Sequence, residues 1–148
     1  MCSTKENLAN IYEAIFTLKA NGLGHALPLY QRYYGEYDLL EAMRENHIRL
    51  ESNPISNLVV TGLKDPKDLH LKELLEQGIL VTINSDDPAM WPSGSLAYNL
   101  YIMAEYYGEP FIHQVIANAI KAAFGLTEEE KTKLLQKFKE MGLKNFNL

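Results

Sequence analysis

Three short segments that resemble β-strands, each followed by helical sequence, restrict the folds open to this chain more than any other feature. The clearest one, at residues 79–84, is rich in β-branched side chains and is bounded by Gly78 and by the run Ser-Asp-Asp-Pro at residues 85–88. The other two lie at residues 23–27 and 48–52. Strands that alternate with helices are typical of repeated βα units around a parallel sheet. The sequence therefore predicts an α/β fold with about three parallel strands.

Apolar residues at helical spacing fill much of the remaining chain. The first such run begins with a capping-box spacing, Ser3-x-x-Glu6, and stops at Asn21. A second capping box, Thr127-x-x-Glu130, opens the last run. After the first helix, we expect helices over residues 38–46, 69–77, 95–107, 111–124 and 128–141, a Tyr-rich loop after residue 28, and a further loop over residues 53–68.

Length and charge narrow the possible functions. The 148 residues suit one domain over residues 1–148, and a composition of 47% hydrophobic and 22% charged residues is that of an ordinary globular protein. The net charge of −5 is spread without long runs of one sign, which argues against nucleic acid and membrane partners. The first residues carry no apolar signal segment, so a cytoplasmic location is expected. With Cys2 as the one cysteine, an internal disulfide and a multi-cysteine zinc site are excluded within one chain.

Polar side chains follow each of the three predicted strands. His25 closes the first, the run Asn-Pro-Ile-Ser-Asn at residues 53–57 follows the second, and Asp86 and Asp87 follow the third. The loops at the carboxyl ends of strands converge in βα folds, and chemistry gathers there. Each group also has a structural interpretation: a hydrogen-bonded histidine, a turn built by Pro, Ser and Asn, and an Asx turn ahead of a proline. Two adjacent carboxylates after a buried strand nevertheless repel each other, which structure alone rarely requires.

This group of residues could bind a ligand. One carboxylate could hold a hard or borderline cation while its neighbour accepts a hydrogen bond from a substrate. Trp91, just beyond the two acids, is a candidate for the wall of a pocket. The remaining histidines, His47, His70 and His113, are predicted to have structural roles in or beside helices.

The order and spacing of these motifs resemble a known family. Gly24-His25 comes first, then Asn-Pro-Ile-Ser-Asn at residues 53–57, then Val-Thr-Ile-Asn-Ser-Asp-Asp-Pro-Ala-Met at residues 81–90, with Gly-Ser-Leu-Ala-Tyr at residues 94–98. Together they resemble the C-terminal part of the adenosine and adenine deaminase family. Within that family, the residues of these motifs are most similar to the adenosine deaminase growth factor branch. The resemblance covers nearly the whole chain.

The resemblance implies a fold, a reaction and a role for three residues. Members of the family are TIM barrels in which zinc activates a water molecule that attacks C6 of a purine and releases ammonia. His25 resembles the histidine that orients the zinc-bound hydroxide, Asp86 the aspartate that ligates the metal, and Asp87 the residue that hydrogen-bonds the purine ring. The implied partner is therefore a purine nucleoside or base.

Essential parts of the family pattern are missing from this sequence. The family needs a His-x-His pair on its first strand, and a further His with a general-acid Glu on its fifth, and no His-x-His occurs here. Asp86 is the one zinc ligand that remains, and a single carboxylate does not make a tetrahedral site. We therefore expect this chain alone neither to hold zinc tightly nor to deaminate a purine.

Three strands correspond to the last three βα units of a barrel that needs eight strands and about 250 residues. The predicted fold is therefore a partial TIM barrel with a helical C-terminus. Its open strand edges should pair with something, so we expect an oligomer, a complementing N-terminal half, or a truncated product of limited stability. Two further functions stay open: a non-catalytic purine-binding module, and a half-barrel subunit that becomes active on assembly.

Overall fold

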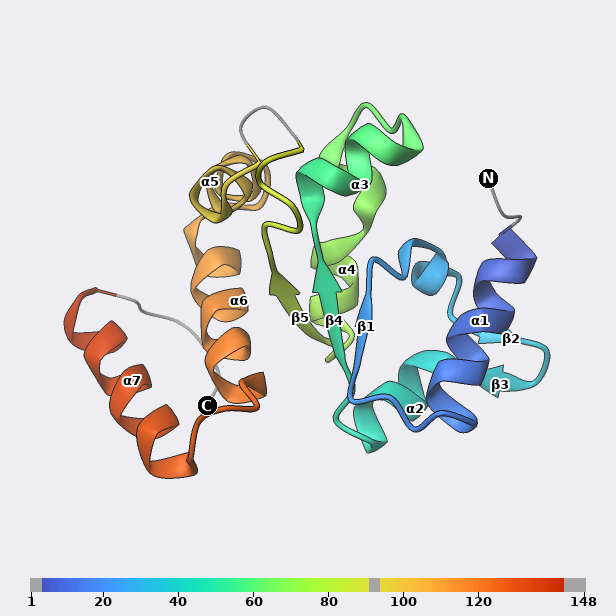
Figure 1. Ribbon diagram of the computed structural model, residues 1–148, viewed down its shortest axis with the longest axis horizontal. Helices are drawn as coiled ribbons and strands as arrows, with labels where there is room; N and C mark the ends of the chain where they lie inside the picture. Colours follow the sequence, from blue (N-terminus) through green and yellow to red (C-terminus); the bar gives the residue numbers. More distant parts are fainter. Residues whose placement is uncertain (1–3, 91–93, 143–148) are drawn as a thin grey trace.

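A three-stranded parallel sheet lies at the centre of the molecule, for which the computed structural model describes residues 4–90 and 94–142. The sheet consists of β1 (Gly22–Gly24), β4 (Arg49–Ser52) and β5 (Leu80–Ile83), with β4 in the middle (Figure 1). The register aligns Leu23 with Leu50, and Leu50 with Val81. The predicted α/β fold with three parallel strands is confirmed.

The first strand is shorter than predicted because the chain turns sharply at its end. His25 and Ala26 have φ angles of 64° and 23°, outside the extended region. The Ala26 amide donates to the Gly24 carbonyl at 2.8 Å, which closes a tight turn. His25 therefore lies just beyond the strand, where its side chain is held at the carboxyl edge of the sheet.

Helices precede, connect and follow the strands, largely as the apolar spacing predicts. The capping box of Thr127 and Glu130 is present at the start of the last helix, whereas Ser3 of the first predicted box lies outside the described residues. The helices that agree with the prediction are α1 (Thr4–Phe16), α2 (Leu39–Glu45), α4 (Leu71–Glu76), α5 (Leu96–Tyr107), α6 (Glu109–Ala122) and α7 (Glu128–Glu140).

The prediction of a loop over residues 53–68 is wrong. That segment forms a helix, α3 (Pro54–Thr61), followed by the 3₁₀ helix η2 (Pro66–Leu69). Pro54 occupies the first helical position, where its missing N–H is no loss, and Gly62 ends the helix with a left-handed φ of 75°. The Pro-x-Ser-Asn run is therefore the first turn of a helix and not an isolated turn.

The Tyr-rich loop contains short regular elements that the sequence did not predict. They are the 3₁₀ helix η1 (Leu27–Gln31) and a small antiparallel hairpin of β2 (Tyr33–Tyr34) and β3 (Tyr37–Asp38). The Arg32 Nε donates to Asp38 Oδ2 at 2.8 Å across the hairpin, and Asp38 Oδ1 caps α2 by accepting from the Leu40 and Glu41 amides. This ion pair and cap join the hairpin to the helix that leads into β4.

The two faces of the sheet differ in character. Leu23, Leu50 and Val81 lie on one face and belong to the buried core, together with side chains of α1, α2, α4 and α6. Because side chains alternate along a strand, Arg49, Glu51 and Thr82 lie on the opposite, polar face. The apolar face thus fixes the sheet against the helices, and the carboxyl ends of the strands emerge together at one edge.

The outer strands meet helices at the two sides of the sheet. α6 lies beside β5, and α1 lies on the β1 side (Figure 1). Between α1 and β1 there is a groove of about 400 Å³, lined mainly by small and apolar residues. Within residues 4–90 and 94–142, no strand pairs with the outer edge of β1. None of the helices in this part of the chain is long and apolar enough to cross a membrane.

Candidate functional site

The carboxyl edge of the sheet brings together polar residues that are distant in the sequence. His25 follows β1, Asn57 lies in the first turns of α3 after β4, and Asp86 follows β5. They line a cavity of about 320 Å³ with Leu27, Ser56, Val60 and Thr61. The predicted convergence of His25, the Pro-x-Ser-Asn run and Asp86 is what the structure shows.

The buried side-chain amide of Asn57 holds the ring of His25. His25 Nδ1 lies 2.5 Å from Oδ1 of Asn57, a residue that is only 2% exposed. The side-chain Nδ2 of Asn57 in turn donates to Oγ of the buried Ser52 at 3.5 Å. His25 therefore has the hydrogen bond that a structural role would require, while about half of its side chain is exposed and it lines the cavity.

The other ring nitrogen of His25 faces a carboxylate. His25 Nε2 lies 3.8 Å from Oδ2 of Asp86, whose side chain is 35% exposed. Both residues have left-handed backbone angles, φ 64° for His25 and φ 58° for Asp86. A side chain in that region is strained, and such residues gather at functional sites.

The second carboxylate of the Asp-Asp pair makes a different contact. Asp87 Oδ1 accepts from the Ala89 amide at 3.0 Å, which is the Asx turn that the motif predicts. Asp86 and Asp87 therefore serve different partners, because one approaches His25 and the other stabilises its own turn. Both are exposed, so the repulsion between them is screened by water.

Asn53 also contacts the ring of His25. Its Nδ2 lies 3.2 Å from Nε2 and 3.4 Å from Nδ1, both within hydrogen-bond distance. The NH₂ group of an amide only donates, so Asn53 can bind whichever of the two ring nitrogens carries no proton. Asn53 and Asp86 therefore both lie near Nε2.

A buried asparagine that the sequence reasoning missed ties these loops together. Asn99 of α5 is fully buried, and its Oδ1 accepts from the Ile55 amide at the start of α3. Its Nδ2 donates to the Gly94 and Ser95 carbonyls at 3.2 and 3.0 Å. A lone polar residue in the apolar run Leu-Ala-Tyr-Asn-Leu-Tyr-Ile-Met was the one signal that could have identified it.

The described residues do not fit a complete metal site. Over residues 4–90 and 94–142, no group of three or more His, Cys, Asp or Glu side chains is arranged to hold an ion. Asp86 offers one carboxylate, whereas a structural or catalytic zinc takes three or four protein ligands. Trp91, the candidate pocket wall, lies outside the described residues.

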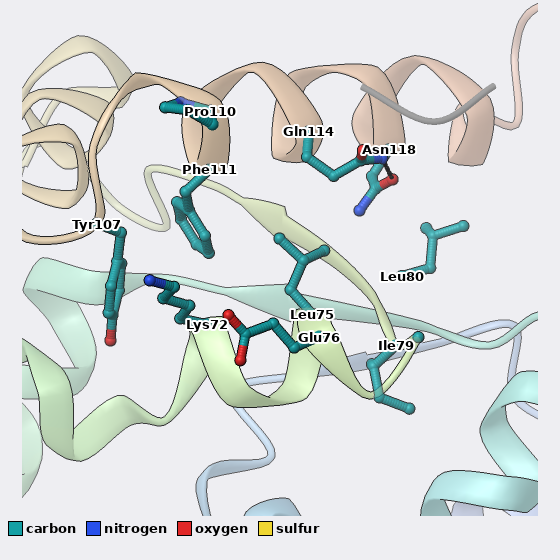
Figure 2. Close-up of a pocket in the computed structure, with 11 residues that line it drawn as sticks. Lys72, Leu75, Glu76, Ile79, Leu80, Tyr107, Pro110, Phe111, Gln114 and Asn118 are labelled. Atoms are coloured by element: carbon teal, nitrogen blue, oxygen red, sulfur yellow. Dashed lines mark hydrogen bonds between the residues drawn. The ribbon is translucent and has the colours of Figure 1, made fainter. Parts of the chain in front are cut away.

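A larger groove lies away from the strand-end residues, on the outside of the molecule. It has a volume of about 520 Å³, and Figure 2 shows that α4 and α6 form its two walls. Burial raises the pKa of Tyr107 in this groove to about 12, and its hydroxyl donates to the Pro66 carbonyl at 3.2 Å. The groove contains neither His25 nor the acids of the Asp-Asp pair. His70 also lies apart from the strand-end residues, stacked on Tyr30 with 4.1 Å between the ring centroids.

Comparisons with known proteins match nearly the whole chain. The family model for adenosine deaminase matches residues 5–141. Adenosine deaminase from Plasmodium gallinaceum is 40% identical over 88 residues, which are 60% of this chain and 23% of that protein. Adenine deaminase from Crocosphaera subtropica is 33% identical over 128 residues, which are 85% of this chain and 38% of that protein.

The fold also has a counterpart among solved structures. The crystal structure of adenine deaminase from Arthrobacter aurescens superposes with a TM-score of 0.80 at 24% identity, and covers 94% of this chain and 42% of that one. At this identity the likeness concerns the fold alone. The three strands and their helices therefore form a partial barrel, and the chain spans less than half the length of each protein compared here.

Proposed function

Since the chain belongs to the adenosine and adenine deaminase family, we propose that it supplies strand-end residues of a purine deaminase active site. The observation that carries this proposal is the approach of His25 and Asp86, from the two outer strands of the sheet, to 3.8 Å beside a shared cavity. The Ser-Asp-Asp-Pro motif supplies one member of that pair. The substrate class is a 6-aminopurine, either as the base or as its nucleoside.

The proposed reaction is hydrolysis of the 6-amino group. A bond forms between the oxygen of water and C6 of the purine, and the bond from C6 to the exocyclic nitrogen breaks. The two protons of the water end on N1 of the ring and on the departing amine, so the products are a 6-oxopurine and ammonia. His25 is placed to take up a proton through Nε2 during this reaction, because its side chain lines the cavity.

Two acidic residues have separate roles in the proposal. Asp86 lies beside His25 and contributes one carboxylate to a metal site, which is zinc by resemblance to the family. Asp87 hydrogen-bonds the purine ring through its second carboxylate oxygen. Because the described residues do not make a metal site by themselves, we propose that the remaining ligands come from another polypeptide segment.

Assembly is part of the proposal. The outer edge of β1 borders a groove of about 400 Å³ and pairs with no strand in the described part of the chain, and exposed edges of this kind pair readily with other strands. We propose that the chain works as a half-barrel, completed either by a complementary segment or by further copies.

Complementation tests the proposal. The chain is mixed with a polypeptide covering the part of Plasmodium gallinaceum adenosine deaminase that this chain does not match, and adenosine turnover is followed by ultraviolet absorbance. We expect no turnover by the chain alone, turnover by the mixture, and none when the mixture contains Asp86→Ala. Glu36→Gln, an exposed acid in the β2–β3 hairpin, is the matched control and should retain the full rate.

Two outcomes would contradict the proposal. Turnover by the isolated chain would show that it needs no further ligands. A folded mixture that stays inactive over the whole range of added zinc would show that these strand ends do not complete a deaminase site.

A second function is favoured by one observation, the cavity itself. It is present beside His25, Asn57 and Asp86 without a complete metal site in the described residues. A purine-binding module without chemistry would need only such a cavity. Calorimetry with adenosine, adenine and inosine separates the two functions, since heat from the isolated chain favours binding, and no heat with any of the three removes the binding module.

A further inference from the structure

The side chain of Asn57 is the buried hydrogen-bond partner of His25. Asn57 Oδ1 lies 2.5 Å from His25 Nδ1, and the two residues are 32 positions apart in the sequence. The exposures of the two differ sharply, with Asn57 at 2% and the His25 side chain at 49%. The amide therefore forms a fixed base for a side chain that faces the cavity.

This contact determines where the imidazole carries its proton. A carbonyl oxygen can only accept a hydrogen bond, so Nδ1 must be the protonated nitrogen of the neutral ring. Asn57 Nδ2 points away from the ring and lies 3.5 Å from Ser52 Oγ, a hydroxyl that can accept from it. Asn53 Nδ2, which can only donate, lies 3.2 Å from His25 Nε2, so this second contact also favours an unprotonated Nε2.

We propose that Asn57 is a positioning residue that holds His25 as the Nδ1-protonated tautomer, so that Nε2 keeps a lone pair at the edge of the cavity, near Asn53 and Asp86. This inference rests on the proposed function for its consequence, because a histidine that takes up a proton through Nε2 needs that lone pair in the cavity. The tautomer itself does not depend on that function.

The backbone around both residues keeps the pair in place. The backbone N–H of Asn57 donates to the backbone carbonyl of Asn53 at 2.8 Å in the first turn of α3. The start of that helix is anchored by Pro54 at the first helical position and by the bond from the Ile55 amide to Asn99. On the other side, the His25 amide donates to the Glu51 carbonyl at 3.0 Å. Two separate anchors therefore set the distance between the amide and the imidazole.

The experiment reads the tautomer directly. The chain is prepared with ¹⁵N-labelled histidine, and long-range proton–nitrogen correlation spectra are recorded at about pH 9, where free histidine is neutral. We expect His25 to show a protonated Nδ1 and an unprotonated Nε2, with its signals assigned by their loss in His25→Gln. A protonated Nε2 in the unmodified chain would overturn the proposal without any further variant.

Variants at Asn57 separate positioning from simple packing. Asn57→Leu keeps a similar volume without an acceptor, so the proton should move to Nε2, the form that free histidine prefers. Asn57→Asp keeps an acceptor oxygen, and Nδ1 should stay protonated. Asn118→Leu is the control, because Asn118 is equally buried but its Nδ2 donates to the Val81 carbonyl and it does not touch His25.

A folded Asn57→Leu chain that keeps Nδ1 protonated would also overturn the proposal. If that variant does not fold, Asn57→Ser takes its place, since its shorter side chain does not reach Nδ1. In the complemented enzyme, loss of Asn57 should lower kcat about 10–100-fold with little change in KM. Inactive mixtures with the expected tautomer would remove the proposed function and leave the positioning role standing.

Discussion

The same three strands carry two polar pairs that differ in almost every respect. On the polar face of the sheet, Arg49 Nε donates to Glu51 Oε1 at 2.6 Å, and the guanidinium lies 3.9 Å from the centre of the Phe124 ring. At the carboxyl edge, His25 Nε2 and Asp86 Oδ2 are 3.8 Å apart, and both residues have a strained backbone. The two carboxylates are similarly exposed, but the Arg49 side chain is only 15% exposed and is hydrogen-bonded to Glu51, whereas 49% of the His25 side chain is exposed and its contact with Asp86 is too long for a hydrogen bond. The second pair therefore has capacity left for a ligand.

Structural and functional charges on one sheet therefore differ in their hydrogen bonds and in their backbone. A pair that serves stability has a short hydrogen bond, a covered cation and a relaxed backbone, because unmade bonds and strain both lower stability. A pair that serves a ligand keeps hydrogen-bonding or metal-binding atoms unused, and its backbone strain is balanced by packing elsewhere in the molecule.

The largest change in the free energy of unfolding is expected from the buried core of the sheet that carries both pairs. Leu50 is 2% exposed on β4, the strand between the two outer ones. Leu50→Ala should lower the free energy of unfolding by about 2–5 kcal/mol, because it removes buried methyl groups and leaves a cavity. Urea denaturation followed by circular dichroism measures the change. A loss below about 1 kcal/mol would show that the sheet is not the common platform of the two pairs.

The next effect should separate the two pairs from each other. Glu51→Ala leaves the shielded Arg49 guanidinium without its carboxylate and should lower the free energy of unfolding by about 1–3 kcal/mol. Asp86→Ala removes a carboxylate that lies too far from His25 for a hydrogen bond, and should change that energy by less than about 0.5 kcal/mol. Equal losses in the same urea titrations would contradict the division into a structural and a functional pair.

A second ion pair, between the largely covered Asp38 and Arg32, allows a test by pH. The Arg32 guanidinium beside Asp38 holds the pKa of that carboxyl below its ordinary value. A carboxyl of lowered pKa adds stability above its ordinary pKa of about 3.9, and that stability is lost as the pH falls through the folded value.

Between about pH 5 and pH 3, the free energy of unfolding should therefore fall more steeply in the unmodified chain than in Asp38→Asn. Urea titrations at each pH measure the two slopes. Parallel slopes would show that Asp38 is not stabilised by its partner.

The sequence could predict the composition of the functional pair but not its geometry. His25 and Asp86 were found because polar residues at strand ends stand out against apolar strands, and the family motifs contain both. Their left-handed angles could not be found, since neither is the glycine that usually marks such a position. The contact between His25 and Asn57 depends on α3, a helix that Pro54 and Gly62 made resemble a loop. Local rules do not specify a bond across 32 residues.

The smallest effect should come from the backbone strain at the functional pair. Asp86 has a φ of 58°, where a Cβ atom crowds the following carbonyl and glycine does not. Asp86→Gly should therefore raise the free energy of unfolding by about 0.5–1 kcal/mol relative to Asp86→Ala, although both variants lose the carboxylate and should be equally inactive in the complemented mixture. Comparing these two variants isolates the strain, because the side-chain contact with His25 is missing in both. A glycine variant no more stable than the alanine variant would show that the turn after β5 is relaxed, and the strain would then no longer distinguish this pair from Arg49 and Glu51.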